Sequence, residues 1–125
     1  MVTRVKHLDA EGFQLKVQVE EAKTVKGEEQ VSWFVINKQS EGKRYIATQD
    51  MVTHDPSEMI FSEDGLLGKP SFFAGMQSYN GRNTATLRQR ELTNSSVKVH
   101  VEEETSKDSE VRHVAETVGY MALWH

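Results

Sequence analysis

The feature of this sequence that most constrains its fold is an internal repeat. Residues 4–17 match residues 88–101 at a spacing of 84, and in both copies two short segments flank a turn signal. A second match follows in the same order, because residues 29–36 resemble residues 116–123 at a spacing of 87. Two matches in order with similar turns indicate that one supersecondary unit occurs twice in the chain.

The apolar residues recur with a period of two, which is typical of half-buried β-strands. The clearest cases are residues 13–19 and 97–102. Short apolar runs and weaker alternating segments predict further strands at 31–36, 45–52, 57–61, 72–76, 84–90 and 118–123. No long segment keeps the 3.6-residue apolar spacing of a helix. The sequence therefore predicts an all-β protein, an antiparallel β-sandwich with about six strands per module.

The two copies of the repeat differ in what precedes them. About fifty residues with strands of their own come before the second copy, whereas the first copy begins at once with its matching strand. We therefore expect residues 1–40 to be the C-terminal half of a first repeat, with three strands, and residues 41–125 to be a complete module. Three strands alone expose an apolar face and an unpaired edge. That face is expected either to join the second module in one larger sandwich or to pair with a neighbouring chain.

The composition narrows the classes of partner. The 125 residues carry 15 Lys and Arg against 19 Asp and Glu, a net charge of −4, and no basic cluster dominates. Binding to a phosphate backbone requires clustered cations, so we expect no nucleic acid partner. No apolar stretch approaches the roughly 20 residues of a membrane span, and the first residues lack the apolar core of a signal peptide. The absence of cysteine excludes disulfides and thiolate metal sites.

Several short motifs resemble the H-type lectin domain. In the second copy they are Asn-Gly at 80–81, Thr-Ala-Thr-Leu-Arg at 84–88, Val-Lys-Val-His-Val at 97–101 and Val-Gly-Tyr-Met-Ala at 118–122. The first copy is similar, with Gly-Phe-Gln-Leu-Lys-Val at 12–17 and Val-Ser-Trp-Phe-Val-Ile at 31–36. The Glu-Thr-Val-Gly-Tyr variant at 116–120 resembles the tandem modules of large bacterial exoproteins.

The resemblance implies a six-stranded antiparallel sandwich, often trimeric or hexameric, that binds sugars such as galactose or N-acetylgalactosamine. It implies a non-catalytic carbohydrate-binding module and a homo-oligomer, carried by a larger extracellular or cell-surface protein. The alternative is a structural or adhesive repeat that mediates protein–protein assembly, with calcium as a candidate stabiliser. The expected partner is therefore either a glycan or another protein chain.

Residues beside a turn carry groups that a sugar would need. Tyr79 offers a flat face for a sugar ring, and planar polar side chains follow it. Together with the loop at 104–113, they predict a shallow ligand site made of Tyr79, Asn80, Arg82, Asn83, Glu104 and His113. A tight turn without a ligand is the alternative for the Asn-Gly pair. Trp33 and Tyr120 lie within apolar runs, and we expect both in the core.

The segment 102–116 is strongly acidic. Carboxylates that converge on one loop suit a hard cation such as calcium, which takes six to eight oxygen ligands. The candidate metal ligands are Glu103, Glu104 and Asp108. A solvated loop without metal and a general base made of His113 and a carboxylate are the alternatives. Antiparallel pairing of the flanking strands would bring His113 near Glu103 or Glu104. No other cofactor is expected.

The alternation places Glu116 on the inward face of its strand. A buried carboxylate needs a partner or it takes up a proton. Arg88 and Arg90, on a neighbouring strand of the repeat, are the expected donors of a structural ion pair. In the first copy, the corresponding pair would join Glu29 to a basic residue of the segment 4–6.

The sequence contains no recognised catalytic motif. It has no Gly-x-Ser-x-Gly, no His-Glu-x-x-His and no glycine-rich loop before a helix. We therefore expect a protein that is not an enzyme.

Overall fold

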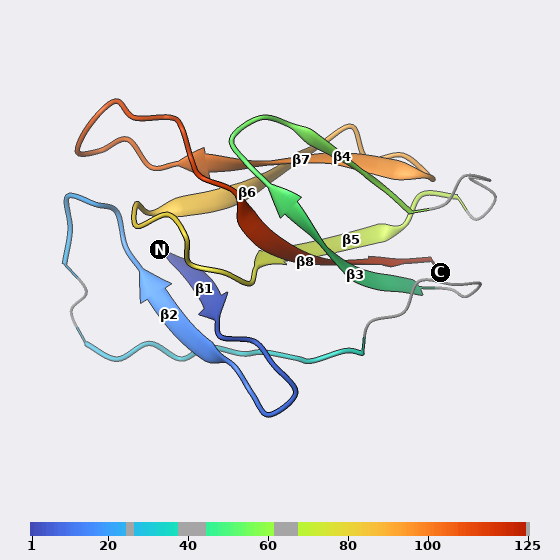
Figure 1. Ribbon diagram of the computed structural model, residues 1–125, viewed down its shortest axis with the longest axis horizontal. Helices are drawn as coiled ribbons and strands as arrows, with labels where there is room; N and C mark the ends of the chain where they lie inside the picture. The colour runs from blue at the N-terminus through green and yellow to red at the C-terminus, as the bar shows by residue number, and fades with distance from the viewer. Residues whose placement is uncertain (25–26, 38–44, 62–67, 125) are drawn as a thin grey trace.

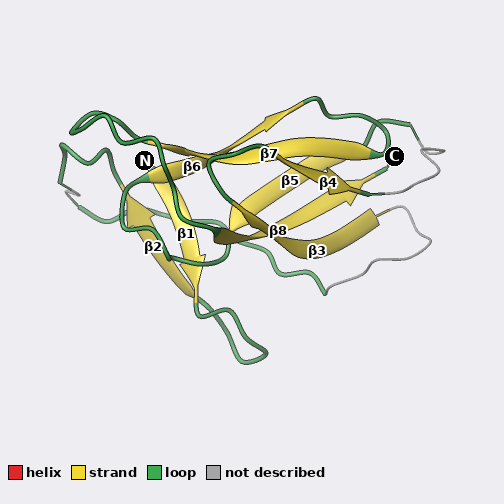
Figure 2. Cartoon of the chain, turned by 45° about the horizontal axis from the view of Figure 1, so that its top comes forward, coloured by secondary structure: helices red, strands yellow, loops and turns green. Residues whose placement is uncertain are grey.

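The structure, a computed structural model, describes residues 1–24, 27–37, 45–61 and 68–124. These residues form eight strands and no helix, as Figure 2 shows. All paired strands are antiparallel. The prediction of an all-β antiparallel protein is therefore confirmed. The expected boundary between residues 40 and 41 lies outside the described residues.

Two three-stranded sheets form a sandwich (Figure 1). The first sheet has the order β3–β8–β5 and contains β3 (Tyr45–Val52), β8 (Glu116–Leu123) and β5 (Ser71–Met76). The second has the order β4–β7–β6 and contains β4 (Ser57–Ile60), β7 (Ser96–Glu103) and β6 (Ala85–Arg90). These six strands lie at the six positions expected within residues 41–125.

Alternating residues of the two central strands form the middle of the core. Val97, Val99 and Val101 of β7 are at most 1% exposed, and Val118 and Ala122 of β8 are 0% exposed. Burial of a valine side chain stabilises a fold by roughly 1.5–3 kcal/mol relative to leaving it in water. Because a shift of one residue would turn this whole set toward solvent, the apolar pattern also fixes the register of the sheets.

Four aromatic rings fill one end of the core. Phe61 lies 5.7 Å from Phe72, 6.3 Å from Tyr120 and 6.0 Å from Trp124, measured between ring centroids. The indole nitrogen of Trp124 donates a hydrogen bond to the Gly68 carbonyl at 2.8 Å, which satisfies its polar group inside the fold. The expectation that Tyr120 packs in the core is confirmed.

The N-terminal residues form a separate hairpin of β1 (Val2–Lys6) and β2 (Gln14–Gln18), which joins neither sheet of the sandwich. Its register repeats that of β6 and β7 at the spacing of 84 residues. Arg4 lies opposite Lys16 in the hairpin, and Arg88 lies opposite His100 in the sandwich.

The turns of the two hairpins also share their hydrogen bonds. The Asp9 amide donates to the Gly12 carbonyl at 3.0 Å, and the Thr93 amide donates to the Ser96 carbonyl at 2.8 Å. In return, Asp9 Oδ1 accepts from the Gly12 amide at 3.0 Å, and Thr93 Oγ1 accepts from the Ser96 amide at 2.9 Å. A short side chain with an oxygen is favoured here because it can bond a backbone amide of its own turn.

A left-handed residue precedes each turn at the same place. His7 has φ 53° and Glu91 has φ 52°. Residues other than glycine adopt this region uncommonly. The repeated register, turn and left-handed residue show that the two hairpins are built alike in three dimensions.

The expected third strand of the N-terminal unit is absent. Residues 27–37 form no strand, so the part of residues 1–40 that the structure describes contains two strands and not three. The matching strand, β8, lies between β3 and β5 and is paired on both sides, whereas the described N-terminal residues offer no such neighbours. The expectation that Trp33 is buried was also wrong, because its side chain is 63% exposed.

Candidate functional site at the junction of hairpin and sandwich

The strongest polar contact between the hairpin and the sandwich is made by Arg4, at the centre of β1. Its residue is 1% exposed, and its guanidinium donates to the carbonyl oxygens of Gly81 at 2.9 Å and Ser78 at 3.2 Å. It also forms a buried ion pair with Glu116. A planar guanidinium with five donors suits such a socket, because it can bond several acceptors at once.

Glu116 is the first residue of β8 and points into the fold, as expected, with 0% exposure. Besides Arg4, its carboxylate accepts from the Ser78 hydroxyl, from the Asn80 and Gly81 amides at 3.0 and 2.8 Å, and from His113 Nε2 at 3.0 Å. Burial disfavours its charge, but the hydrogen bonds outweigh burial and lower the pKa of Glu116 to about 2.

The expected ion-pair partners of Glu116 were wrong. Arg88 bonds Glu102 at 2.8 Å on the surface, and Arg90 lies 3.4 Å from His100 Nε2. Both arginines are exposed, because their strand turns these side chains away from the core. The partner is Arg4, which stands at the position of Arg88 in the first copy of the repeat. The prediction of a buried pair between Glu116 and an arginine was therefore correct, but the arginine comes from the first copy of the repeat and not from the second.

His113 completes this group of buried side chains. It is 3% exposed, and its Nδ1 lies 2.6 Å from Glu103 Oε1 while its Nε2 faces Glu116. His113 therefore approaches Glu103 as expected, but the expected pairing of the flanking strands was wrong, because β7 and β8 lie in different sheets.

Gly81 makes this approach possible. A Cβ atom at Gly81 would lie 2.3 Å from Cε1 of His113, which is closer than real Cβ contacts come. We refer to Arg4, Ser78, Glu103, His113 and Glu116 as the junction cluster.

The ligand-binding residues predicted around Tyr79 gather beside the junction cluster and contact the protein itself. The Tyr79 ring packs under the cations of Arg4 and Lys16, at 4.6 and 4.0 Å from its centroid. Its hydroxyl accepts from Lys16 Nζ at 2.6 Å and donates to the Arg82 carbonyl at 3.1 Å. Tyr79 therefore helps to hold the hairpin.

The two predicted asparagines bond neighbouring loops. Asn80 Nδ2 donates to the Ala115 carbonyl at 2.8 Å, and Asn83 Nδ2 donates to Glu110 at 3.3 Å. The side chain of Asn80 and that of Arg82 remain exposed at the rim of the junction. His113, in contrast, is buried within the junction cluster and is closed to an external ligand.

The predicted metal ligands do not converge. Glu103 contacts His113, Glu104 accepts from the Glu21 amide at 2.8 Å, and Asp108 accepts from the Glu110 amide at 3.0 Å. The hydrogen bond from the Glu21 backbone is the largest cause that lowers the pKa of Glu104. Within the described ranges, no group of three or more His, Cys, Asp or Glu side chains could hold a metal ion.

Hydrogen bonds between side chains and the backbone extend the junction along β2 and beyond it. Gln18 Nε2 donates to the Arg82 carbonyl at 3.2 Å, and the Thr84 hydroxyl donates to the Val19 carbonyl at 2.7 Å. The Thr84 amide donates to Glu21 at 3.3 Å. The hairpin is thus attached to the sandwich mainly through polar groups that have fixed directions.

The fold and the junction together define an all-β protein in which one β-unit is attached to another through a buried arginine and glutamate. No family model, no curated protein and no solved structure matches the chain.

Proposed function

We propose that the protein is a non-catalytic structural module that couples β-units of one repeat into a larger assembly. The observation that carries the proposal is the junction cluster. Its buried charges lie between the two copies of the repeat. Of the side chains expected to bind a ligand, Tyr79, Glu104 and His113 support the same contact. The polar chemistry of the chain is thus concentrated where one unit meets the next.

The physical properties of the cluster suit coupling better than simple adhesion of surfaces. Removal of one partner from a buried ion pair is costly, because the other charge remains buried and unpaired. A hairpin of the correct register and turn is therefore required to place an arginine into the socket around Glu116. Such a contact selects one partner and one orientation, which a repeat protein needs at each junction.

Mechanical unfolding tests this role. When the chain is pulled between its ends, we expect the hairpin and the sandwich to resist as one body. The double variant Arg4→Met, Glu116→Gln removes both charges and leaves neither unpaired. It should detach the hairpin at lower force and speed hydrogen exchange in β1 and β2.

The repeat supplies a matched control for this experiment. Arg88→Met changes the equivalent arginine of the sandwich, which is exposed and pairs with Glu102. It should leave the first rupture unchanged. If the double variant and the control behave alike, the junction cluster does not couple the two units and the proposal fails.

Carbohydrate binding is the second candidate, and two observations favour it. The chain resembles the H-type lectin domain in its motifs, and Trp33, at 63% exposure, offers a flat ring to a sugar. Arg82 and Asn80 add exposed hydrogen-bonding groups. Titration with galactose and N-acetylgalactosamine, with and without calcium, tests this candidate. Binding that is lost in Trp33→Ala or Arg82→Ala would favour the lectin over the structural module.

We propose further that the module belongs to a homo-oligomeric or tandem protein outside the cell or on its surface. The partner would then be a protein chain of the same repeat. In the described ranges no helix is long and apolar enough to span a membrane.

A further inference from the structure

The two copies of the hairpin pack against the rest of the protein through opposite faces. In the sandwich, Val99 and Val101 point into the core and are 1% exposed. Their counterparts in β2 are Leu15 and Val17, at the spacing of 84. Leu15 is 38% exposed and Val17 is half-buried, because the hairpin docks through the face that carries Arg4. The face that corresponds to a sandwich core is therefore left open in the N-terminal unit.

A second counterpart of the core is exposed as well. Tyr120 and Ala122 of β8 are 8% and 0% exposed, whereas the matching Trp33 and Val35 are 63% and 65% exposed. Phe13, before β2, packs edge-on against Trp33 with 5.2 Å between ring centroids. The hairpin and residues 29–36 thus begin to associate as β7 and β8 do, but no second layer from the described residues covers them. Figure 1 shows residues 27–37 running as a loop from the hairpin toward the end of the molecule where β3 begins.

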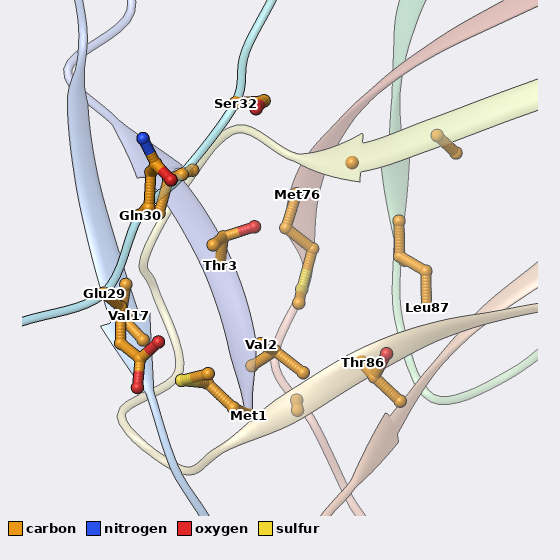
Figure 3. A pocket seen from close by; sticks show the side chains of 14 residues that line it. Met1, Val2, Thr3, Val17, Glu29, Gln30, Ser32, Met76, Thr86 and Leu87 are labelled. Carbon is orange, nitrogen blue, oxygen red and sulfur yellow. The ribbon is translucent and has the colours of Figure 1, made fainter. Parts of the chain in front are cut away.

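A cavity of about 540 Å³ lies between this segment, the hairpin and the edge of the sandwich. Figure 3 shows Thr3 and Val17 of the hairpin on one side, Glu29 and Gln30 beside them, and Met76 and Leu87 of the sandwich on the other. Most of its lining is apolar or carries hydroxyl groups. The cavity lies where the described part of the N-terminal unit has no second layer of strands.

Charge supplies an independent observation. Glu29 stands at the position of Glu116, the residue that accepts Arg4. In contrast with Glu116, Glu29 is exposed and forms no ion pair within the described part of the chain. The counterpart of the socket in the N-terminal unit therefore has its carboxylate but not the loop around it.

From these observations we infer that the open face of the N-terminal unit binds a three-stranded part of a further unit of the same repeat, equivalent to β3, β4 and β5. The added strands place residues 31–36 between two antiparallel neighbours, as β3 and β5 flank β8. The added loop, equivalent to residues 78–81, encloses Glu29. This inference deepens the proposed function, on which it depends, by naming the partner.

The partner can be supplied from the chain's own sequence. A copy of residues 41–86 replaces Met1 and Val2, so that it ends directly before Thr3. This is the position that the repeat spacing of 84 requires. Hydrogen exchange of residues 31–36 should become about 100-fold slower than in the unmodified chain, as expected when an exposed segment becomes a central strand. Quenching of Trp33 by acrylamide should fall in parallel, with Trp33→Phe as the reference for the signal of Trp124.

Two variants sharpen this experiment. In the control, Val52→Asp and Met76→Asp are introduced in the added copy alone, which prevents it from packing and should restore fast exchange. Glu29→Gln should leave the unmodified chain unchanged, since Glu29 is exposed there. In the extended chain the same substitution should speed the exchange, because the added loop would lose the carboxylate that its amides bond, as the Asn80 and Gly81 amides bond Glu116.

Unchanged exchange of residues 31–36 in the extended chain would overturn the inference. An unmodified chain that sedimented as a dimer with these residues already protected would overturn it too, since a second copy would then be the occupant. Neither result alters the mechanical test of Arg4 and Glu116. Failure of the partner and failure of the coupling function are therefore distinguishable.

Discussion

Arg4 and Arg88 occupy equivalent positions in two hairpins of the same register, yet Arg4 is buried against Glu116 and Arg88 pairs with Glu102 at the surface. The residue two positions beyond the cross-strand neighbour differs between the two hairpins. In the sandwich it is Glu102, which holds Arg88 within its own hairpin. In the N-terminal hairpin it is Gln18, which carries no charge and leaves the arginine available to the socket.

The first prediction concerns the two arginines. Arg4→Met should cost about 3–5 kcal/mol of unfolding free energy, because Glu116 is left as an unpaired buried charge. Arg88→Met should leave the unfolding free energy nearly unchanged, as expected for an exposed pair. Denaturant unfolding followed by circular dichroism measures both. Adding Glu116→Gln to Arg4→Met should recover part of the loss, and strict additivity of the two changes would contradict the buried pair.

The second prediction tests the residue that separates the two hairpins. Gln18→Glu gives the N-terminal hairpin the carboxylate that the sandwich has at Glu102. It should weaken docking by roughly 1–3 kcal/mol, because Gln18 is 7% exposed and donates to the Arg82 carbonyl, which a carboxylate cannot do. Hydrogen exchange of β1 and β2 reports the change.

The reverse substitution is the control for this prediction. Glu102→Gln lies on the surface and should alter stability by less than about 1 kcal/mol. Equal effects of the two substitutions would show that position 18 does not decide whether the arginine leaves its hairpin.

Much of the fold followed from local pattern. Alternation and turn chemistry are properties of a few consecutive residues, and they were sufficient to predict the six strands of the sandwich and the repeated hairpin. The inward direction of Glu116 also followed, because it depends only on the period of its own strand.

The errors concern contacts that local pattern does not determine. Residues 31–36 have the composition of a buried strand, but a strand also needs neighbours, and those near the first copy are absent from the described residues. The partner of Glu116 is 112 positions away in the sequence, and two equivalent arginines were available. Docking of the hairpin through its outer face decided between them, and nothing in the spacing of residues indicates which face docks.

The third prediction follows from the lowered pKa of Glu116, which is about 2 against an ordinary value of 4.5. Above pH 4.5 the carboxylate is ionised in both the folded and unfolded states, and its contribution to stability is complete. Between pH 4.5 and 2 the unfolded chain takes up the proton first, so the stability contributed by Glu116 is lost as the pH falls. The loss should be on the order of 3 kcal/mol.

Unfolding curves recorded across this range measure that loss. Glu116→Gln should remove this component of the pH dependence, whereas Glu102→Gln, on the surface, should leave it in place. A wild-type profile that stayed parallel to that of Glu116→Gln down to pH 2 would refute the ionised, buried carboxylate.

The last prediction compares two glycines that each lie under a polar side chain. A Cβ at Gly81 would lie 2.3 Å from the His113 ring, and a Cβ at Gly119 would lie 2.1 Å from the Gln77 amide. The distances are similar, but the neighbours differ in their freedom. His113 is held at both ring nitrogens by Glu103 and Glu116, whereas the Gln77 amide is the end of a flexible side chain.

Gly81→Ala should therefore displace the His113 ring, so that Glu116 loses one of its hydrogen-bond donors. We expect this to destabilise the protein by about 1–3 kcal/mol, whereas Gly119→Ala should cost less. Thermal unfolding of the two variants, with the His113 ring followed by NMR, measures both effects. If Gly119→Ala is the more harmful of the two, the packing of His113 against the loop is not what stabilises the junction cluster.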